Sequence, residues 1–151
     1  MKVSKKKILK EFKEYLKEAK LKYTPQREEI LNEILSTKGH FEVEDIVYTL
    51  KEKKKNVSRA TVYRTLSILK DMGIVNEVIK YKNKTIYELG LEKHHDHLIC
   101  VSCGEIIEFF NKKLEEIQDN ICKNFKFHPF THRLEIYGLC QKCYEKENSK
   151  N

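Results

Sequence analysis

The segment His94–Gly104 reads HHDHLICVSCG and holds three histidines, one aspartate and a Cys-x-x-Cys pair. So many metal-ligating side chains in so short a stretch are hard to explain by packing, although a solvated polar loop is the simpler alternative. In an extended backbone successive side chains point to opposite faces, so His95 and His97 would face one way and His94 and Asp96 the other. One segment could therefore supply two separate nitrogen and oxygen metal sites.

Four cysteines form two Cys-x-x-Cys pairs, Cys100 with Cys103 and Cys140 with Cys143. Four thiolates at such spacings can complete a tetrahedral shell, which is typical of structural zinc. Two disulfides or a redox dithiol are the alternatives. The chain shows no signal peptide, so we expect a cytoplasmic protein with reduced thiols. Cys122 lies among apolar residues at helical spacing and is expected to be an inert core thiol.

The charge is distributed unevenly along the chain. Thirty Lys and Arg against 23 Asp and Glu give a formal charge of +7. Lysines concentrate in the first sixty residues, as at 5–7 and 53–55, whereas all the cysteines and five of the six histidines follow residue 90. This predicts a basic N-terminal lobe and a metal-bearing C-terminal lobe. The charge favours a polyanionic partner, and no apolar run reaches the ~20 residues that a membrane span needs.

The N-terminal lobe is predicted to contain four helices. Apolar spacing indicates helices over 4–20 and 43–52, and Thr24-Pro25 is typical of an N-cap followed by proline at the first position of a second helix. Ser58 is expected to cap a fourth helix that runs to about Met72. The exposed face of the fourth helix would carry Arg59, Tyr63, Arg64, Ser67 and Lys70.

Two strands, 74–81 and 84–89, follow the fourth helix and predict a β-hairpin. Helices and hairpin together indicate a winged helix-turn-helix whose fourth helix suits a DNA major groove. Arg64 could reach guanine edges or phosphate, and Tyr63 a thymine methyl or a backbone oxygen. A solvated basic helix on an ordinary small α/β domain is the alternative.

The C-terminal lobe is predicted to be strand (98–101), strand (105–110), helix (111–125) and strand (132–138). A lobe of about sixty residues is near the lower limit for an independent core, so it should need zinc, a partner subunit or both. We expect an α+β protein with a winged-helix DNA-binding domain (1–89) and a small α/β dimerisation domain with a four-cysteine structural zinc site (90–147). A polar tail, disordered from about Glu145 and assigned as 148–151, would end the chain.

The chain resembles the ferric uptake regulator (Fur) family of metal-dependent repressors over residues 20–143. The motifs that carry the resemblance are Thr24-Pro25-Gln26-Arg27, Ala60-Thr61-Val62-Tyr63-Arg64-Thr65-Leu66, His94-His95-Asp96-His97-Leu98-Ile99-Cys100 with Cys103-Gly104, and Cys140-x-x-Cys143.

The resemblance implies three metal sites and a DNA-binding surface. Structural zinc would be held by Cys100, Cys103, Cys140 and Cys143. A regulatory metal that spans the hinge at Gly90 would be held by His40, Glu88, His95, His97 and Glu108. An additional metal would be held by His94, Asp96, Glu115 and His132. The DNA contacts would include Lys22, Arg59, Tyr63 and Arg64.

The function implied is that of an Fe(II)-dependent repressor that binds A/T-rich inverted repeats as a homodimer or tetramer. Mn(II), Co(II) or Zn(II) could substitute at a site of imidazoles and carboxylates, so a zinc, manganese or peroxide sensor is the alternative. Zinc sensors of the family often place a cysteine in the sensory site, and peroxide sensors tend to have aspartates where this chain has Glu88 and Glu108. Both differences favour iron.

Simpler roles exist for several of these residues. His40 could end a helix, Glu88 could face solvent, His132 could pair with Glu135, and Lys22 could be merely solvated. A metallohydrolase would need an open coordination position and a general base, which the proposed ligand sets do not offer, so we expect no enzyme. A zinc-stabilised protein-interaction module would leave the basic fourth helix unexplained.

Overall fold

The structure is a computed structural model that describes residues 4–81, 83–91, 94–130 and 132–150. Lys82 of the predicted hairpin turn and Asn151 of the predicted tail lie outside the described residues. The chain folds as two compact units, residues 1–92 and 93–151. In the described part of the chain, no helix has the length and apolar character to cross a membrane.

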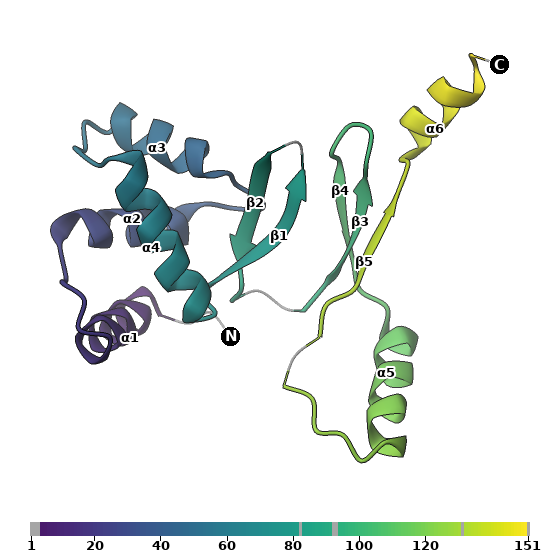
Figure 1. Ribbon diagram of the computed structural model, residues 1–151, viewed down its shortest axis with the longest axis horizontal. Coiled ribbons are helices and arrows are strands. Elements are labelled where there is room, and N and C mark those ends of the chain that lie inside the picture. The colour runs from purple at the N-terminus through teal and green to yellow at the C-terminus, as the bar shows by residue number, and fades with distance from the viewer. Residues whose placement is uncertain (1–3, 82, 92–93, 131, 151) are drawn as a thin grey trace. The chain divides into compact units, whose positions relative to one another are not determined.

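The N-terminal unit consists of four helices and a hairpin (Figure 1). Strands β1 and β2 pair antiparallel, with Val75 opposite Leu89 and an irregularity between Glu77 and Ile79. The prediction of helices followed by a β-hairpin is therefore confirmed. The elements are α1 (Lys5–Glu18), α2 (Pro25–Ser36), α3 (Val43–Glu52), α4 (Arg59–Asp71), β1 (Val75–Tyr81) and β2 (Lys84–Leu89).

Helices α2 and α4 begin at the predicted capping residues. The Thr24 hydroxyl accepts a hydrogen bond from the Arg27 amide at 3.3 Å, and Pro25 occupies the first helical position. The Ser58 hydroxyl accepts from the Thr61 amide at 3.2 Å. Each cap satisfies one of the amides that a helix leaves unpaired in its first turn.

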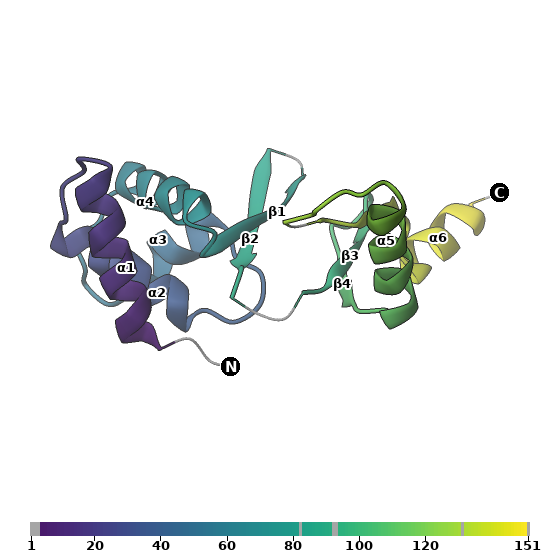
Figure 2. The same ribbon diagram turned by 90° about the horizontal axis from the view of Figure 1, so that it is seen from below.

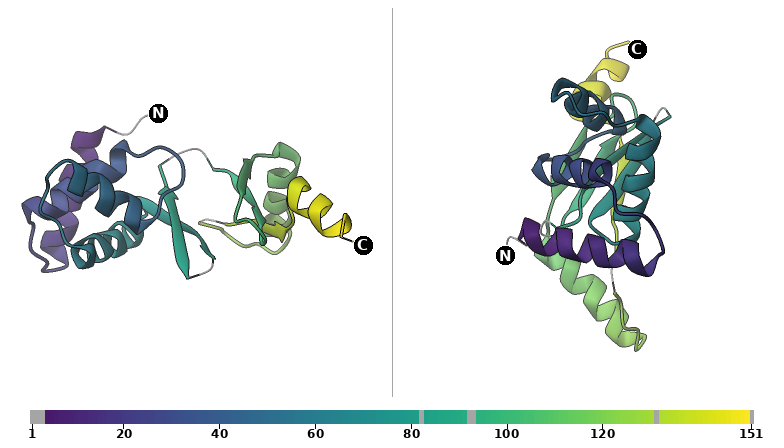
Figure 3. Two further views of the ribbon diagram at one scale, coloured as in Figure 1. Left: turned by 90° about the horizontal axis from the view of Figure 1, so that it is seen from above. Right: turned by 90° about the vertical axis from the view of Figure 1, so that its left-hand side faces the viewer.

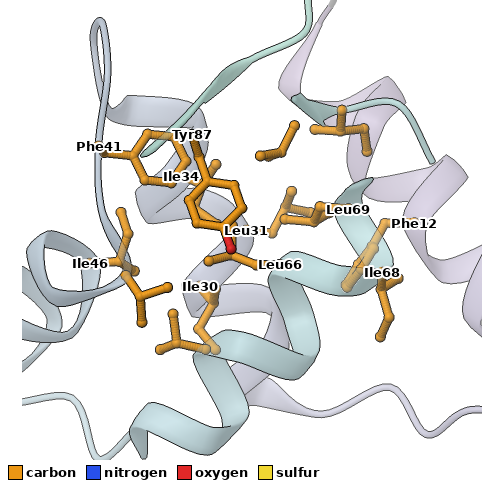
Figure 4. Packing of buried hydrophobic residues seen from close by; sticks show 14 of the residues in the cluster. Phe12, Ile30, Leu31, Ile34, Phe41, Ile46, Leu66, Ile68, Leu69 and Tyr87 are labelled. Carbon is orange, nitrogen blue, oxygen red and sulfur yellow. The ribbon is translucent and has the colours of Figure 1, made fainter. Parts of the chain in front are cut away.

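The core of this unit is built from the apolar stripes of all four helices (Figure 4). The rings of Phe41 and Tyr87 stack at a centroid distance of 5.9 Å. The backbones of these two residues exchange hydrogen bonds of 2.8 and 2.9 Å, so the segment before α3 adds a short bridge to β2. The largest fully buried side chains of the helices are Phe12, Leu16, Ile30, Leu31, Ile34, Ile46, Leu66 and Leu69.

The C-terminal unit is built on a three-stranded sheet in the order β4-β3-β5 (Figure 1). Figures 2 and 3 show this unit from other sides, with α6 in yellow near the C-terminus. Strand β3 pairs antiparallel with β4 and parallel with β5. The start of β3 therefore meets the end of β4 and the start of β5, whereas the end of β3 meets the end of β5. The elements are β3 (Asp96–Cys100), β4 (Ile106–Phe109), α5 (Lys112–Asn124), β5 (Glu135–Gly138) and α6 (Gln141–Asn148).

Helix α6 corrects the expectation of disorder from Glu145 onward, because the helix continues to Asn148. The Gln141 side chain donates a hydrogen bond to the Glu145 carboxylate, one turn along the helix. Its amino end is fixed at Cys140, so the second cysteine pair starts a helix. The predicted α+β fold class is confirmed.

Helix α5 has an apolar face at helical spacing, and within the single chain this face is exposed. Ile117, Ile121 and Phe125 are 56%, 51% and 81% exposed. Among the described residues of this unit, the buried apolar side chains are Ile99, Cys100 and Cys143. Cys122 lies half-buried on a helix without a buried side chain, so the expectation of a core thiol is wrong.

Candidate metal centres and nucleic-acid interface

The four paired cysteines converge at the end of the sheet where β3 and β5 finish. Their sulfur atoms all lie within 4.8 Å of one another. The Cys103 and Cys140 sulfurs are 3.8 Å apart. Gly104, with a φ of +79°, turns the chain back, and its amide donates to the Cys100 carbonyl at 2.9 Å. All five cysteines are described and free of disulfides.

The thiols of this cluster influence one another's protonation. Backbone hydrogen bonds from Cys103 and Cys140 lower the pKa of Cys100 to about 6. The pKa of Cys140 is raised to about 12, because burial and thiol contacts outweigh the larger opposing effect of a Cys143 backbone hydrogen bond. One sulfur therefore ionises easily and disfavours a second charge nearby. Four sulfurs so close suit a divalent cation that replaces their protons, and zinc is the ion that four thiolates usually hold.

A second cluster lies at the opposite end of the sheet, where β3 and β5 begin. The His94 Nε2 atom is 3.3 Å from an Asp96 oxygen and 3.4 Å from a Glu115 oxygen. The His132 Nε2 atom is 3.2 Å from the other Glu115 oxygen, and the His94 and His132 rings are 4.3 Å apart. One potential ligand atom from each of the four residues fits within a 4.8 Å span. The pairing of His132 with Glu135 is not present; Glu135 accepts from Arg133 and Tyr137.

The buried polar atoms of this second cluster fit a cation. Asp96 is completely buried, and neither carboxylate oxygen accepts a hydrogen bond from any described residue. The Glu115 Oε1 atom is also buried and accepts no hydrogen bond from any described residue. Buried carboxylates without hydrogen bonds are costly unless paired or bound to metal. Two imidazoles and two carboxylates are ligands that Fe(II), Mn(II), Co(II) and Zn(II) accept.

His95, His97 and Glu108 form a third group within the C-terminal unit. The His95 and His97 rings lie edge to face at 4.9 Å. In the β3–β4 ladder, His97 is directly opposite Glu108, and the His95 Nε2 atom is 3.7 Å from a Glu108 oxygen. The alternation predicted from the sequence thus places these histidines together and apart from the His94 cluster.

His40 and Glu88 are neighbours in the N-terminal unit. Because Phe41 pairs with Tyr87, the residues next to them also come together, and the His40 Nε2 atom lies 3.4 Å from a Glu88 oxygen. His40 therefore does more than end a helix, and Glu88 is buried rather than facing solvent. His40 and Glu88 belong to one unit and the other three residues assigned to the regulatory metal belong to the second unit.

A basic groove of about 600 Å³ opens beside the amino ends of α2 and α4. The positively charged side chains Lys22 and Arg64 line it, as do the capping residues Thr24 and Ser58. The exposed amides at a helix start carry partial positive charge that favours anions. The full lining is Lys20, Leu21, Lys22, Thr24, Gln26, Arg27, Asn56, Ser58, Thr61 and Arg64.

The groove contains residues that sequence reasoning missed. Arg27 lines it, and its guanidinium donates to the backbone carbonyl of Lys22, which ties the Arg27 side chain to the segment before α2. The paired helix caps were the available signal, because they mark two helix starts that packing could bring together. Two expected DNA contacts lie elsewhere on α4: Tyr63 is 50% exposed, and Arg59 forms a 2.8 Å ion pair with Glu44.

Comparisons with known proteins agree with one another. Residues 18–137 match the family described as the Ferric uptake regulator family. The chain is 38% identical over 145 residues to the ferric uptake regulation protein of Campylobacter upsaliensis, covering 95% of this chain and 93% of that protein. It is also 37% identical over 140 residues to the peroxide operon regulator of Bacillus subtilis, covering 93% of this chain and 96% of the relative.

Solved structures give the same result. The structure superposes on the Helicobacter pylori ferric uptake regulator with a TM-score of 0.79 and 30% sequence identity. The match covers 95% of this chain and 97% of the other, and that protein is described as having three functional metal-binding sites.

Proposed function

This chain belongs to the ferric uptake regulator family, whose members are metal-responsive transcription regulators rather than enzymes, and we propose that it is an Fe(II)-dependent repressor of iron-uptake genes. It would bind A/T-rich inverted repeats in the cytoplasm as a dimer or a tetramer. The observation that carries the proposal is the pairing of a basic groove at two helix starts with three groups of metal-ligating side chains.

The structural role is assigned to Cys100, Cys103, Cys140 and Cys143, which would hold Zn(II). Four thiolates leave no open position, so this site stabilises and does not catalyse. The cysteines join the ends of β3 and β5 to α6 in a unit that has little buried apolar surface. Zinc binding there would contribute directly to folding, as in other small zinc-dependent domains.

The regulatory role is assigned to two ligand groups that share one divalent cation. His40 and Glu88 would contribute from the N-terminal unit, and His95, His97 and Glu108 from the C-terminal unit. Ligands from both units would restrict rotation about the connection at Gly90. The α4 helices of the two subunits, which would enter the DNA major groove, would then be held at the separation that two half-sites require. The cation strengthens DNA binding only by its preference for that arrangement, and such coupling is typically ~1–3 kcal/mol.

DNA would be bound through the groove and the exposed face of α4. Lys22 and Arg64 would contact phosphates or base edges beside the two helix starts, and Tyr63 and Arg59 would extend the contact along α4. The exposed apolar residues of α5, Ile117 and Ile121, would be covered by the second subunit. A twofold mate also provides the paired half-sites of an inverted repeat.

Iron is preferred for the regulatory ligands because the set is nitrogen and oxygen only and contains Glu88 and Glu108 rather than aspartates. Manganese, cobalt or zinc could occupy the same ligands. The similarity to the Bacillus subtilis peroxide operon regulator is the observation that keeps a peroxide sensor as the second candidate. The additional site of His94, Asp96, Glu115 and His132 would hold a further divalent cation, since both Asp96 oxygens and one Glu115 oxygen are buried and accept no hydrogen bond from the described residues.

The test is fluorescence anisotropy with an A/T-rich inverted-repeat duplex. Anaerobic protein that retains its tightly bound zinc is titrated with Fe(II), Mn(II) or Zn(II) at fixed salt. We expect affinity to rise with Fe(II), and the rise to disappear when His95→Ala and Glu108→Ala are combined. His128→Ala, a histidine to which no ligand role is assigned, is the matched control and should respond as the unmodified protein does.

Two results would contradict the proposal. Binding that does not change with any of the three metals would remove the shared-cation mechanism. A response to Zn(II) at low concentration but not to Fe(II) would make the protein a zinc sensor.

A further inference from the structure

One more buried polar atom lies on α5, the helix that contributes Glu115 to the cluster of His94, Asp96, Glu115 and His132. The side-chain oxygen of Gln118 is shielded from solvent and accepts no hydrogen bond from any described residue. No metal role was expected for this residue from the sequence. Side-chain amide oxygens occur regularly among the protein ligands of hard divalent cations such as Ca²⁺.

Gln118 is positioned on α5 to act together with Glu115. The two residues are three apart, so their side chains leave the same side of the helix with Cβ atoms roughly 5–6 Å apart. Both are half-buried, whereas Glu116, Ile117 and Asp119 between and beside them are exposed. Gln118 therefore shares the inward face from which Glu115 reaches both histidines.

Four buried oxygens, from Asp96, Glu115 and Gln118, accept no hydrogen bond from the described residues. One Asp96 oxygen and the Glu115 oxygen among them lie 3.3 and 3.4 Å from the His94 Nε2 atom, and the other Asp96 oxygen and the Gln118 oxygen have no such contact with a described residue. The two ionised carboxylates carry no proton with which to satisfy each other. A cation is the kind of partner that satisfies several oxygens at once.

We propose that the Gln118 amide oxygen is an additional ligand of this site, which then holds a divalent cation with at least five protein ligands. The inference rests on the proposed function, which assigns the other four ligands to an additional metal. Two imidazoles, two carboxylates and an amide oxygen suit Fe(II), Mn(II) or Co(II), which accept more than four ligands, better than a tetrahedral Zn(II). Gln118 is thus a metal-specificity residue of this chain.

The test uses Co(II) as the probe in the full chain, with its zinc retained and with His95→Ala and Glu108→Ala removing the regulatory ligands. Visible absorption of Co(II) is intense with four ligands and weak with five or six. We expect weak absorption in this background. Gln118→Leu should lower Co(II) affinity by about tenfold or more and give the intense spectrum, whereas Gln118→Glu should keep both the affinity and the weak spectrum.

The control is Asn120→Leu, which removes an exposed amide from the same helix and should change neither quantity. An unchanged affinity and spectrum in Gln118→Leu would overturn the inference. So would a Gln118→Glu protein as weak as Gln118→Leu, because that result would assign the effect to the amide N–H group. If His94→Ala also leaves Co(II) binding unchanged, the additional metal site itself fails, which is a separate failure of the proposed function.

Discussion

Replacing Lys22 with glutamine should weaken DNA binding in a way that depends strongly on salt. Lys22 is exposed and lines the basic groove beside the start of α2. Each phosphate contact contributes about 0.9 to the slope of log affinity against log salt. A dimer on an inverted repeat presents two copies of Lys22, so the variant's slope should be shallower by about 1.8. Between about 50 and 200 mM salt, this difference corresponds to roughly tenfold.

The assay is anisotropy of a labelled operator duplex at saturating metal and four salt concentrations. The variant should bind more weakly than the unmodified protein at low salt, and the ratio of their affinities should shrink by about tenfold at the upper end of the range. Lys113→Gln, which removes an exposed lysine from α5, is the control with the same charge change. A defect of constant size at all salt concentrations would refute phosphate contact by Lys22 and indicate a neutral contact or a folding effect instead.

Three further outcomes follow from the structure. Leu66→Ala, in a fully buried position of α4, should lower the free energy of unfolding by about 2–5 kcal/mol, measured by urea denaturation followed by circular dichroism. Cys103→Ser should abolish the zinc that co-purifies with the protein, whereas Cys122→Ser, outside the sulfur cluster, should retain it in metal analysis. Asn111→Ala removes the side-chain acceptor that caps α5. It should lower the free energy of unfolding of the C-terminal unit by about 1 kcal/mol, measured as a lower midpoint in urea denaturation.

Local signals were sufficient for most of the N-terminal unit. Thr24 and Ser58 mark helix starts through hydrogen bonds to their own neighbours, which do not depend on the rest of the fold. Gly73, with a φ of +72°, ends α4 in a conformation that other residues rarely adopt. The apolar stripes between these signals then determine which faces pack, and the observed core is formed from them.

The features that could not be predicted from the sequence depend on packing between distant segments of the chain. The basic groove exists because α2 and α4 pack so that their starts lie near each other, and neither cap alone implies that neighbour. Gln118 was overlooked because glutamine on a polar helix usually faces solvent. Periodicity identifies the apolar face of α5 that carries Ile117 and Ile121, but it does not identify the chain that covers this face.

The topology of the C-terminal sheet explains why one short segment can serve two chemically distinct clusters. Strand β3 is central, antiparallel to β4 and parallel to β5, so both of its ends have strand neighbours. Asp96 at one end meets α5 and the approach to β5, and Cys100 at the other end meets the turn toward β4 and the start of α6. Five residues of strand, about 17 Å long, are enough to separate nitrogen and oxygen ligands from sulfur ligands. Because so few apolar side chains of this unit are buried, the metal ligation that we propose at the two ends would supply cross-links that a larger hydrophobic core would otherwise provide.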